Sequence, residues 1–382
     1  MRLRILGLVS AGATVAALAL ATPTSAATGQ ILGAGGPHAV AGSYLVVMKD
    51  GVTASAAGLA AKYGASVGHT YSHALRGFEA RVSEAGAKRL AADPAVKYVE
   101  QNSIVWGDAT QSPVPSWGLD RIDARSGLDN SYTYPNTAAN VHVYSIDTGV
   151  ASHSDLSGRV TSGFDAIGGG TVDCNGHGTH TSSTAGGTTF GVAKQVQIVA
   201  VRVLDCSGSG TFAQVIAGVD WVTANAIKPA VANMSLGGGA TAALDTAVTN
   251  SINSGVVYSV SAGNANANAC QQSPARVPAA ITVGATDIND NRASFSNKGR
   301  CLDLFAPGVA ITGAWLNNTT NTISGTSMAA PHVTGAAAIL LSAHPTWTPQ
   351  QVRDRIVADA TRGVGNRGGG SPNLLLFVSQ AP

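Results

Sequence analysis

The sequence predicts an α/β fold in which helices wrap a mainly parallel sheet, preceded by a small α+β domain. Two observations support this fold class. After residue 140, short runs rich in Val, Ile and Ala alternate with helical patterns, as in parallel sheets covered by helices. Residues 42–104 instead show the order strand, helix, strand, strand, helix, strand, which is typical of ferredoxin-like domains.

The first 26 residues have the three parts of a secretory signal peptide. Arg2 and Arg4 form the charged part, residues 5–21 the apolar part and Thr24-Ser25-Ala26 the small-residue cleavage site. This run is too short to favour a membrane span, and no later run approaches about 20 apolar residues. We therefore expect a secreted, extracellular protein with no membrane partner.

The small domain follows an Ala- and Gly-rich segment, residues 27–41, which is expected to be a flexible leader. Strand patterns are found at 44–48, 69–75, 78–82 and 96–99, and helix patterns at 54–63 and 83–92. A domain of only about 60 residues is marginally stable alone. A polar linker with two prolines, residues 109–115, then leads into the larger part of the chain.

The larger part contains five β-rich runs that predict buried strands, at 141–146, 197–203, 230–234, 256–260 and 281–283. Helical patterns are found at 212–226, 241–254 and 328–341. The last helix is expected to begin near Thr326 or Ser327, with Pro331 in its first turn, and to end before Pro345. Active sites in such folds collect at the carboxyl ends of the strands.

Composition restricts the partners and the chemistry. Only 12% of the residues are charged and the formal net charge is +2, so no nucleic-acid-binding surface is indicated. In an exported protein, four cysteines (Cys174, Cys206, Cys270 and Cys301) predict two disulfides. Three pairings are possible, of which the sequential one closes two loops of similar span. The spacing fits no zinc site.

The first candidate catalytic residues follow the first predicted strand of the larger part. Asp147-Thr148-Gly149 stands at the carboxyl edge of that strand, where an aspartate can orient a catalytic group or simply form a turn. The next motif, Asn175 to His180, contains two histidines. His177 and His180 lack the glutamate of H-E-x-x-H and a third ligand, which argues against zinc. A histidine acting as a general base needs a carboxylate on one ring nitrogen and a hydroxyl on the other.

The hydroxyl is supplied by the segment Gly325-Thr326-Ser327-Met328-Ala329-Ala330-Pro331. Ser327 is expected at a helix N-terminus, where unpaired N–H groups favour negative charge; alone, it would be interpreted as a helix cap. The order Asp, His, Ser differs from that of α/β-hydrolases, and Ala329 breaks the esterase pattern G-x-S-x-G.

Together the three motifs resemble those of the subtilisin family of serine proteases. Asp173-Cys174-Asn175-Gly176 and Val203-Leu204-Asp205-Cys206 are most similar to the proteinase K branch and its aqualysin-like enzymes. The resemblance implies a three-layer αβα catalytic domain at 109–382 and an inhibitory prosegment at 27–108, cut off autocatalytically near Asp108–Ala109. It also implies the disulfides Cys174–Cys206 and Cys270–Cys301.

The resemblance assigns the catalytic roles. His177 takes the proton of Ser327 and later protonates the leaving amine, while Asp147 holds the imidazole tautomer. His180 is then structural. Ser261-Ala262-Gly263-Asn264 matches the family's oxyanion segment, so the side chain of Asn264 and the backbone N–H of Ser327 are expected to bind the oxyanion. No cofactor is expected for catalysis.

The substrate is expected to bind as an added strand between Gly208-Ser209-Gly210 and Ser235-Leu236-Gly237. Ser261-Ala262-Gly263 would form the opposite wall of the P1 pocket, and Phe212 is a candidate floor of the P4 pocket or a core residue. None of these segments is charged, which favours apolar or aromatic P1 residues. Gln272 stands near the P1 pocket where proteinase K has an aromatic residue.

Relatives of this kind bind structural calcium through carboxylates and backbone carbonyls. The resemblance implies one site formed by Asp303 and the backbone oxygens of Pro278 and Ala280. Asp120 and Asp123, with Asp129 as a further candidate, would form a second. Two departures stand out: Ala124 replaces a ligand of this second site, and Thr181-Ser182-Ser183 replaces the usual Val-Ala-Gly after His180, so that the helix carrying His177 is expected to pack differently.

The sequence therefore predicts a monomeric, secreted serine endopeptidase that acts on proteins and peptides and is first inhibited by its own prosegment. A secreted peptide-binding protein that kept the fold without catalysis is the alternative from another class. An esterase is a third reading, because acyl transfer is shared chemistry.

Overall fold

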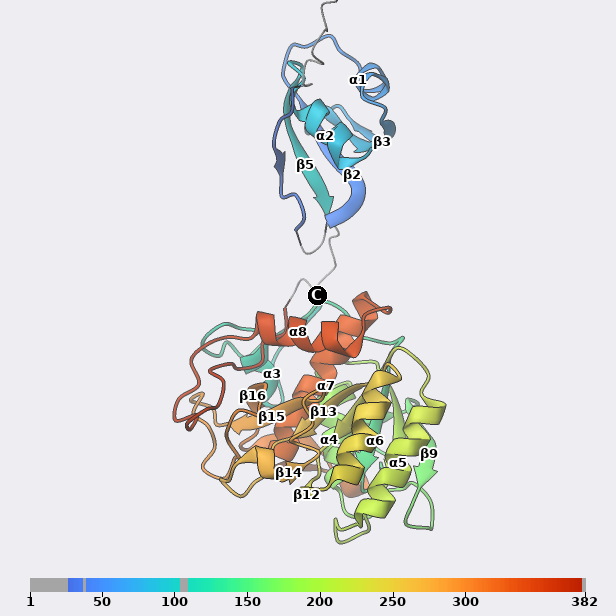
Figure 1. The fold of residues 1–382 in the computed structure, drawn as a ribbon, viewed down its shortest axis with the longest axis vertical. Coiled ribbons are helices and arrows are strands. Elements are labelled where there is room, and N and C mark those ends of the chain that lie inside the picture. Colours follow the sequence, from blue (N-terminus) through green and yellow to red (C-terminus); the bar gives the residue numbers. More distant parts are fainter. Residues whose placement is uncertain (1–26, 37–38, 104–108, 380–382) are drawn as a thin grey trace, which may run out of the picture. The chain divides into compact units, whose positions relative to one another are not determined.

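A computed structural model describes residues 27–36, 39–103 and 109–379. The chain forms two compact units, Met1–Val105 and Trp106–Pro382. The signal peptide predicted at 1–26 lies outside the described residues, and so does Asp108, on one side of the predicted cut. Both units are drawn in Figure 1 and are treated separately below.

The smaller unit is a five-stranded sheet of order β1-β5-β2-β4-β3, covered by two helices. Its elements are β1 Ile31–Leu32, β2 Ala39–Met48, α1 Ala56–Lys62, β3 Ser66–Tyr71, β4 Gly77–Arg81, α2 Glu84–Ala91 and β5 Val96–Ser103. Six of these follow the predicted order. Both helices begin after a serine that accepts a backbone N–H, Ser55 from Gly58 and Ser83 from Gly86.

The predicted flexible leader is wrong for part of its length. Ile31–Leu32 forms the short strand β1, which pairs in parallel with β5, and β2 already begins at Ala39. Ile31 packs against the core of this unit, so a single apolar side chain and an available strand edge order a segment that composition alone describes as a linker.

The larger unit contains a seven-stranded, entirely parallel sheet of order β16-β15-β13-β11-β8-β10-β9. In chain order its strands are β8 His142–Asp147, β9 Val160–Asp165, β10 Gln197–Arg202, β11 Ala230–Met234, β13 Val257–Ser261, β15 Ile281–Thr286 and β16 Leu304–Pro307. The five predicted strands are confirmed. The two missed strands, β9 and β16, are the edges of the sheet: β9 contains polar and glycine residues, and β16 has only four residues.

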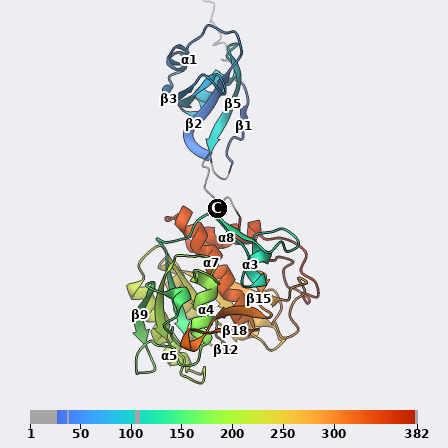
Figure 2. The same cartoon turned by 180° about the vertical axis from the view of Figure 1, so that it is seen from behind.

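Helices cover both faces of this sheet (Figure 1 and, from behind, Figure 2). α5 Phe212–Asn225 and α6 Ala242–Asn253 pack on one face; α4 His177–Gly186, α7 Thr326–Ala343 and α8 Pro349–Asp359 contribute to the core on the other. The three-layer αβα prediction is confirmed. The remaining strands form the pairs β6 Ala109–Gln111 with β7 Tyr132–Tyr134, β12 Gly238–Gly239 with β14 Gln272–Ser273, and β17 Ile311–Ala314 with β18 Thr320–Ile323. The other helices are α3 Trp117–Ile122 and the short 3₁₀ helices η1 Ser154–Leu156, η2 Ala269–Gln271 and η3 Leu316–Asn318.

Helix α7, the most C-terminal of the predicted helices, begins at Thr326 and ends before Pro345 as expected. Pro331 lies in its second turn rather than its first. There its missing N–H leaves the carbonyl of Ser327 without its helical donor. The hydroxyl of Ser235 donates to that carbonyl at 2.8 Å, so the helix continues through the proline. Across the described ranges, none of the helices combines the length and apolarity needed to cross a bilayer.

Candidate active site

The centre of the site is a hydrogen-bonded pair formed by the last residue of β8 and the first residue of α4. His177 Nδ1 lies 2.7 Å from Asp147 Oδ1. Asp147 is completely buried, and its Oδ1 also accepts the backbone N–H of Thr148 at 2.7 Å. A buried carboxylate on one ring nitrogen fixes the tautomer of the imidazole and leaves Nε2 to accept a proton.

The electrostatics of this pair favour the charged imidazole. Burial lowers the pKa of His177, but the charge and hydrogen bond of Asp147, with the charge of Asp173, outweigh it and raise that pKa above the ordinary value. An imidazole in this setting is suited to hold a proton transiently, as a general base must.

A second buried carboxylate, Asp173, organises the N-terminus of α4. Its Oδ1 accepts the Thr148 hydroxyl at 2.8 Å and the backbone N–H groups of Asn175 and Gly176. Its Oδ2 accepts the N–H and the hydroxyl of Thr179. Asp173 thereby connects the residue after Asp147 to the first turn of the helix that begins with His177. Negative charge is also favourable at a helix N-terminus.

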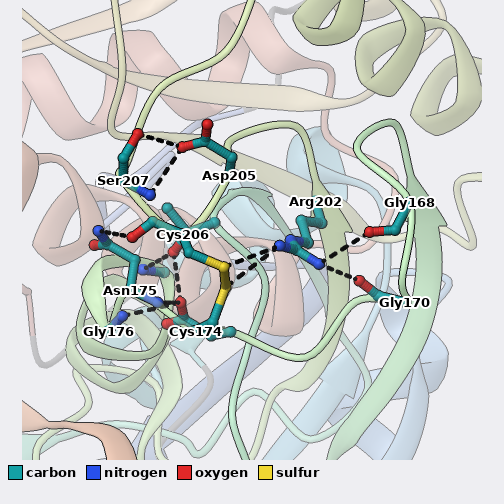
Figure 3. Close-up of a disulfide and its surroundings, with 12 residues drawn as sticks. Gly168, Gly170, Cys174, Asn175, Gly176, Arg202, Asp205, Cys206 and Ser207 are labelled. Carbon is teal, nitrogen blue, oxygen red and sulfur yellow. Dashed lines mark hydrogen bonds between the residues drawn. A yellow bond between two sulfur atoms is a disulfide. The ribbon is translucent and has the colours of Figure 1, made fainter.

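The disulfide Cys174–Cys206 links the same helix start to the next loop (Figure 3). Asn175 donates from Nδ2 to the carbonyl of Cys206 at 3.0 Å, and its Oδ1 accepts the N–H of His177 at 3.2 Å. The buried guanidinium of Arg202 lies against both sulfurs and donates to the carbonyl of Gly170. The second disulfide joins Cys270 to Cys301, so the pairing is the predicted one.

The expected nucleophile, Ser327, is the second residue of α7 and is partly exposed. Its hydroxyl donates to the carbonyl of Ser235 at 3.1 Å, while Ser235 donates back to the carbonyl of Ser327. Ser235 and His177 line one cleft of about 410 Å³. Among the described residues, no hydrogen bond joins Ser327 to His177, and such contacts commonly tighten only when substrate binds.

Beside Ser327, the amide nitrogen of Asn264 has no recorded hydrogen-bond acceptor among the residues that the structure describes. Asn264 Oδ1 accepts the N–H and the hydroxyl of Thr326, both at 2.8 Å, which fixes the amide with its Nδ2 pointing the other way. A methyl group added at Gly325 would lie 3.6 Å from this Nδ2 and 3.6 Å from the N–H nitrogen of Ser327. Two nitrogen donors therefore border the same space at the N-terminus of α7, where negative charge is favoured.

The loop that carries Asn264 is held by a residue that the sequence did not reveal. Asn297 is fully buried; its Oδ1 accepts the N–H groups of Ala265 and Ala267, and its Nδ2 donates to the carbonyl of Ala262. The same Nδ2 lies 3.0 Å from Oε1 of Gln272. Gln272 thus lies against Gly263, near the predicted P1 wall.

The two expected substrate-binding segments lie on the cleft. Gly208-Ser209-Gly210 and Ser235-Leu236-Gly237 both line it, and His177 is the one titratable side chain among its lining residues. Ser261 Oγ contacts the carbonyl of Leu236 at 3.5 Å. Phe212, expected at the P4 pocket, is 39% exposed at the start of α5, and its ring covers Gly238, next to the second segment.

The polar run that replaces Val-Ala-Gly after His180 is buried and satisfied. Thr181 Oγ1 lies 3.2 Å from the carbonyl of Gly178 and 3.4 Å from Asp147 Oδ2. Ser182 bonds to Ser145, and Ser183 bonds to Asp155 and accepts the N–H of Ala314. His180, on the same helix, lies 3.1 Å from the carbonyl of Ile311 through Nε2, and burial lowers its pKa to about 4.

The two calcium sites implied by the resemblance differ in how well their residues fit a cation. Asp303 Oδ1 accepts hydrogen bonds from Nε (3.0 Å) and Nη2 (2.5 Å) of Arg353, and Oδ2 accepts one from the N–H of Thr282. Pro278 borders the adjoining cavity, whereas Ala280 is completely buried. The cation paired with Asp303 in the structure is therefore the guanidinium of Arg353, and these residues do not fit calcium.

The aspartates near the start of the larger unit fit a cation better. Asp120 accepts the N–H groups of Asp129 and Asn130, which draws the Asp129 segment toward it. Asp123 accepts the N–H of Thr133 at 2.6 Å. Burial, together with the charges of Asp129 and Asp120, raises the pKa of Asp123 to about 6. Nevertheless, the described ranges contain no cluster of three or more His, Cys, Asp or Glu side chains arranged to hold a metal.

Similar proteins identify the family. The Subtilase family pattern matches residues 138–374, and the Peptidase inhibitor I9 pattern matches residues 43–106. The chain is 52% identical to an extracellular serine proteinase of Thermus sp. (strain Rt41A), over 96% of this chain and 97% of that protein. It is 49% identical to alkaline serine exoprotease A of Vibrio alginolyticus, over 82% of this chain and 61% of that protein.

A solved structure agrees with these relatives. A cold adapted subtilisin-like serine proteinase superimposes with a TM-score of 0.69 at 51% sequence identity, covering 70% of this chain and 99% of that chain. The family match spans more than half of the sequence, and the Thermus relative is similar over nearly its whole length. The chain therefore belongs to the subtilase family of serine proteinases.

Proposed function

We propose that this chain is a secreted serine endopeptidase in which Asp147, His177, Ser327 and Asn264 carry the catalysis. Ser327 Oγ attacks the carbonyl carbon of the scissile peptide bond while His177 Nε2 takes its proton. His177 then gives this proton to the leaving amine, and water hydrolyses the acyl-enzyme by the same route in reverse. The observation that carries the proposal is the 2.7 Å pair of His177 with the buried Asp147. His177 lines a cleft together with Ser235, the hydrogen-bond partner of Ser327.

The oxyanion of the tetrahedral intermediate is assigned to Asn264 Nδ2 and the N–H of Ser327. The supporting observation is that Thr326 occupies the amide oxygen of Asn264, so that its N–H₂ group is oriented before substrate arrives. A donor fixed in advance costs no reorganisation when charge develops.

The substrate is proposed to bind as an extended strand between Gly208–Gly210 and Ser235–Gly237, which line one cleft. Ser261–Gly263 would form the P1 wall, and Phe212 would contribute to the P4 position. The cleft carries no permanently charged side chain, which favours apolar or aromatic P1 residues. The Gln272 amide beside Gly263 would make the P1 wall more polar than an aromatic side chain.

Residues 27–108 are proposed to inhibit the enzyme until it cuts them off near Asp108–Ala109. The support is the Peptidase inhibitor I9 match at 43–106 and the separate small unit. The extracellular location rests on the predicted signal peptide and on the name of the Thermus relative. N-terminal sequencing of the mature secreted protein gives its first residue and therefore locates the cut.

No cofactor takes part in this chemistry. For structural calcium we propose Asp120, Asp123 and Asp129 as ligands. Burial, with a smaller contribution from the charges of Asp129 and Asp120, raises the pKa of Asp123, and a bound cation would favour its charged form. A bound ion would supply only positive charge and cross-linking at this position.

Fluorophosphonate labelling tests the proposed function. The probe should modify Ser327 in the mature secreted protein, and the labelled protein should no longer hydrolyse casein. A non-catalytic peptide-binding protein would stay unlabelled. Turnover of peptide substrates compared with lipid esters separates a peptidase from an esterase, and faster lipid ester turnover would contradict the proposal.

A further inference from the structure

The residues around Asp303 indicate how its buried negative charge is neutralised in this protein. A cavity of about 250 Å³ borders this carboxylate. Its lining includes three arginines, Arg276, Arg300 and Arg353, but Asp303 is its single acidic side chain. Positive charge is therefore already abundant beside this carboxylate, before any metal ion is considered.

We propose that the Arg353 guanidinium is the permanent cation of the Asp303 site, so that this site works without calcium. Arg353 holds Asp303 Oδ1 with two N–H donors, and the N–H of Thr282 holds Oδ2. The Asp303 side chain is only 9% exposed. A buried carboxylate of this kind requires a charged partner, and an arginine that stays protonated supplies one under all conditions.

The neighbouring charges disfavour a divalent ion at the same place. Arg276 is paired with Asp245 at 2.5 Å, whereas the structure records no ion pair for Arg300 within the described ranges. A calcium ion would therefore lie beside Arg353 and Arg300 with a single carboxylate to offset their charges. Removing Arg353 is expected to convert the cavity from cation-repelling to cation-accepting.

The position of Arg353 depends on α8. Thr348 and Gln351 form a capping box at the start of this helix, and Val352 and Ile356 are buried on either side of Arg353. Asp303 in turn accepts the N–H of Thr282 in β15. The ion pair consequently joins the last helix directly to the sheet, which is the cross-linking role that a bound ion would have.

Calcium counting by equilibrium dialysis tests this proposal on mature protein whose Ser327 is blocked by a fluorophosphonate. Wild type and Asp303→Asn should bind the same number of calcium ions. Arg353→Ala should bind one more, with a melting temperature that rises by about 5 °C more than that of wild type when calcium is added. Arg353→Ala/Asp303→Asn should lose this extra ion. Arg353→Lys, which keeps the positive charge, should not gain it.

Arg355 provides the matched control, because it forms a 2.6 Å pair with Asp359 on the same helix, away from Asp303. Arg355→Ala should gain no calcium. The proposal is overturned if Asp303→Asn lowers the calcium count of the wild type, or if folded Arg353→Ala binds no extra ion. Should these variants fail to fold, calcium-soaked wild-type crystals decide: an ion at Asp303 contradicts the proposal, and the intact arginine pair supports it.

Discussion

The two helices that carry the catalytic residues begin in opposite ways. α4 starts with His177, and its N-terminal N–H groups are occupied by buried acceptors: Asp173 takes those of Gly176 and Thr179, and Thr148 takes that of Gly178. α7 starts with Thr326, whose N–H is taken by Asn264, but the next N–H, that of Ser327, has no recorded acceptor in the described structure. The N-terminal N–H groups of α4 are thus hydrogen-bonded, whereas that of Ser327 in α7 is available to a ligand. Below, the start of α4 is called the filled helix end and the start of α7 the open helix end.

This difference matches what each helix end must do. The imidazole of His177 needs a fixed orientation before the reaction, and a fixed carboxylate at the helix start provides it. The N-terminus of α7 must instead receive negative charge that exists only during the reaction. We infer that the filled end of α4 positions His177, and that the open end of α7 stabilises the negative charge of the transition state.

Among the residues that position or assist the nucleophile, the largest expected loss comes from removing the charge beside His177. Asp147→Asn should lower kcat/KM by about 10⁴-fold, because the amide no longer fixes the tautomer of the imidazole. The acidic limb of the kcat/KM profile, which in the wild type should lie above pH 6.5 because the pKa of His177 is raised, should shift to lower pH. Steady-state kinetics on a chromogenic peptide measure both. Asp354→Asn is the control, and an unshifted limb in Asp147→Asn would contradict the assigned role.

The next largest effect belongs to the open helix end. Asn264→Ala should lower kcat by about 10²–10³-fold with little change in KM, the magnitude known for such a donor in a subtilisin. Asn264→Asp keeps the oxygen that accepts from Thr326 but removes the N–H₂ donor, so it should lose at least as much. Retained activity in Asn264→Asp would mean that the donor is not used.

A smaller effect is expected at the filled helix end. Asp173→Asn replaces one acceptor oxygen with a donor facing Thr179, and should lower kcat by about 10- to 100-fold through misplacement of His177. Loss of its charge should also move the acidic limb slightly downward. A purely structural role would lower the melting temperature without moving this limb.

The least specific test concerns the histidines buried in the two helices. Burial lowers the pKa of His180 in α4 and of His332 in α7 to about 4, from an ordinary value of 6.5. Because the unfolded chain binds these protons first, the stabilisation is complete above pH 6.5 and is lost as the pH falls toward 4, by about 3 kcal/mol for each histidine. Urea unfolding of Ser327-blocked protein at pH 7 and pH 5 measures this. His332→Gln should lose less stability than wild type over this interval, and an equal loss would refute the assignment.

The sequence allowed the central strands, the helices beside them and the three catalytic motifs to be predicted. Buried parallel strands have continuous apolar runs, and acyl transfer requires particular residue types within short motifs. The edge strands β9 and β16 lack such runs, and β1 is ordered mainly by its pairing with β5. These elements depend on neighbours that are distant in sequence.

The supporting residues could not be predicted for the same reason. Asn297 fixes the Asn264 loop from more than thirty positions away, as its bond to Ala262 shows, and nothing in its local sequence distinguishes it from a turn residue. Arg353 lies on a helix that the sequence reading missed, fifty positions from Asp303. Its pairing with Asp303 depends on how the folded chain brings α8 to the sheet, which the local sequence does not show.

The most direct test of the central claim is the fate of the Ser327→Ala protein. In a culture grown separately from the wild type, Ser327→Ala should keep residues 27–108 attached, show no casein hydrolysis and resist fluorophosphonate labelling. The control Ser342→Ala, at the other end of α7, should mature normally. N-terminal sequencing and a casein assay give the result. A Ser327→Ala protein that is processed on its own and hydrolyses casein at the wild-type rate would contradict the assignment of Ser327 as the nucleophile.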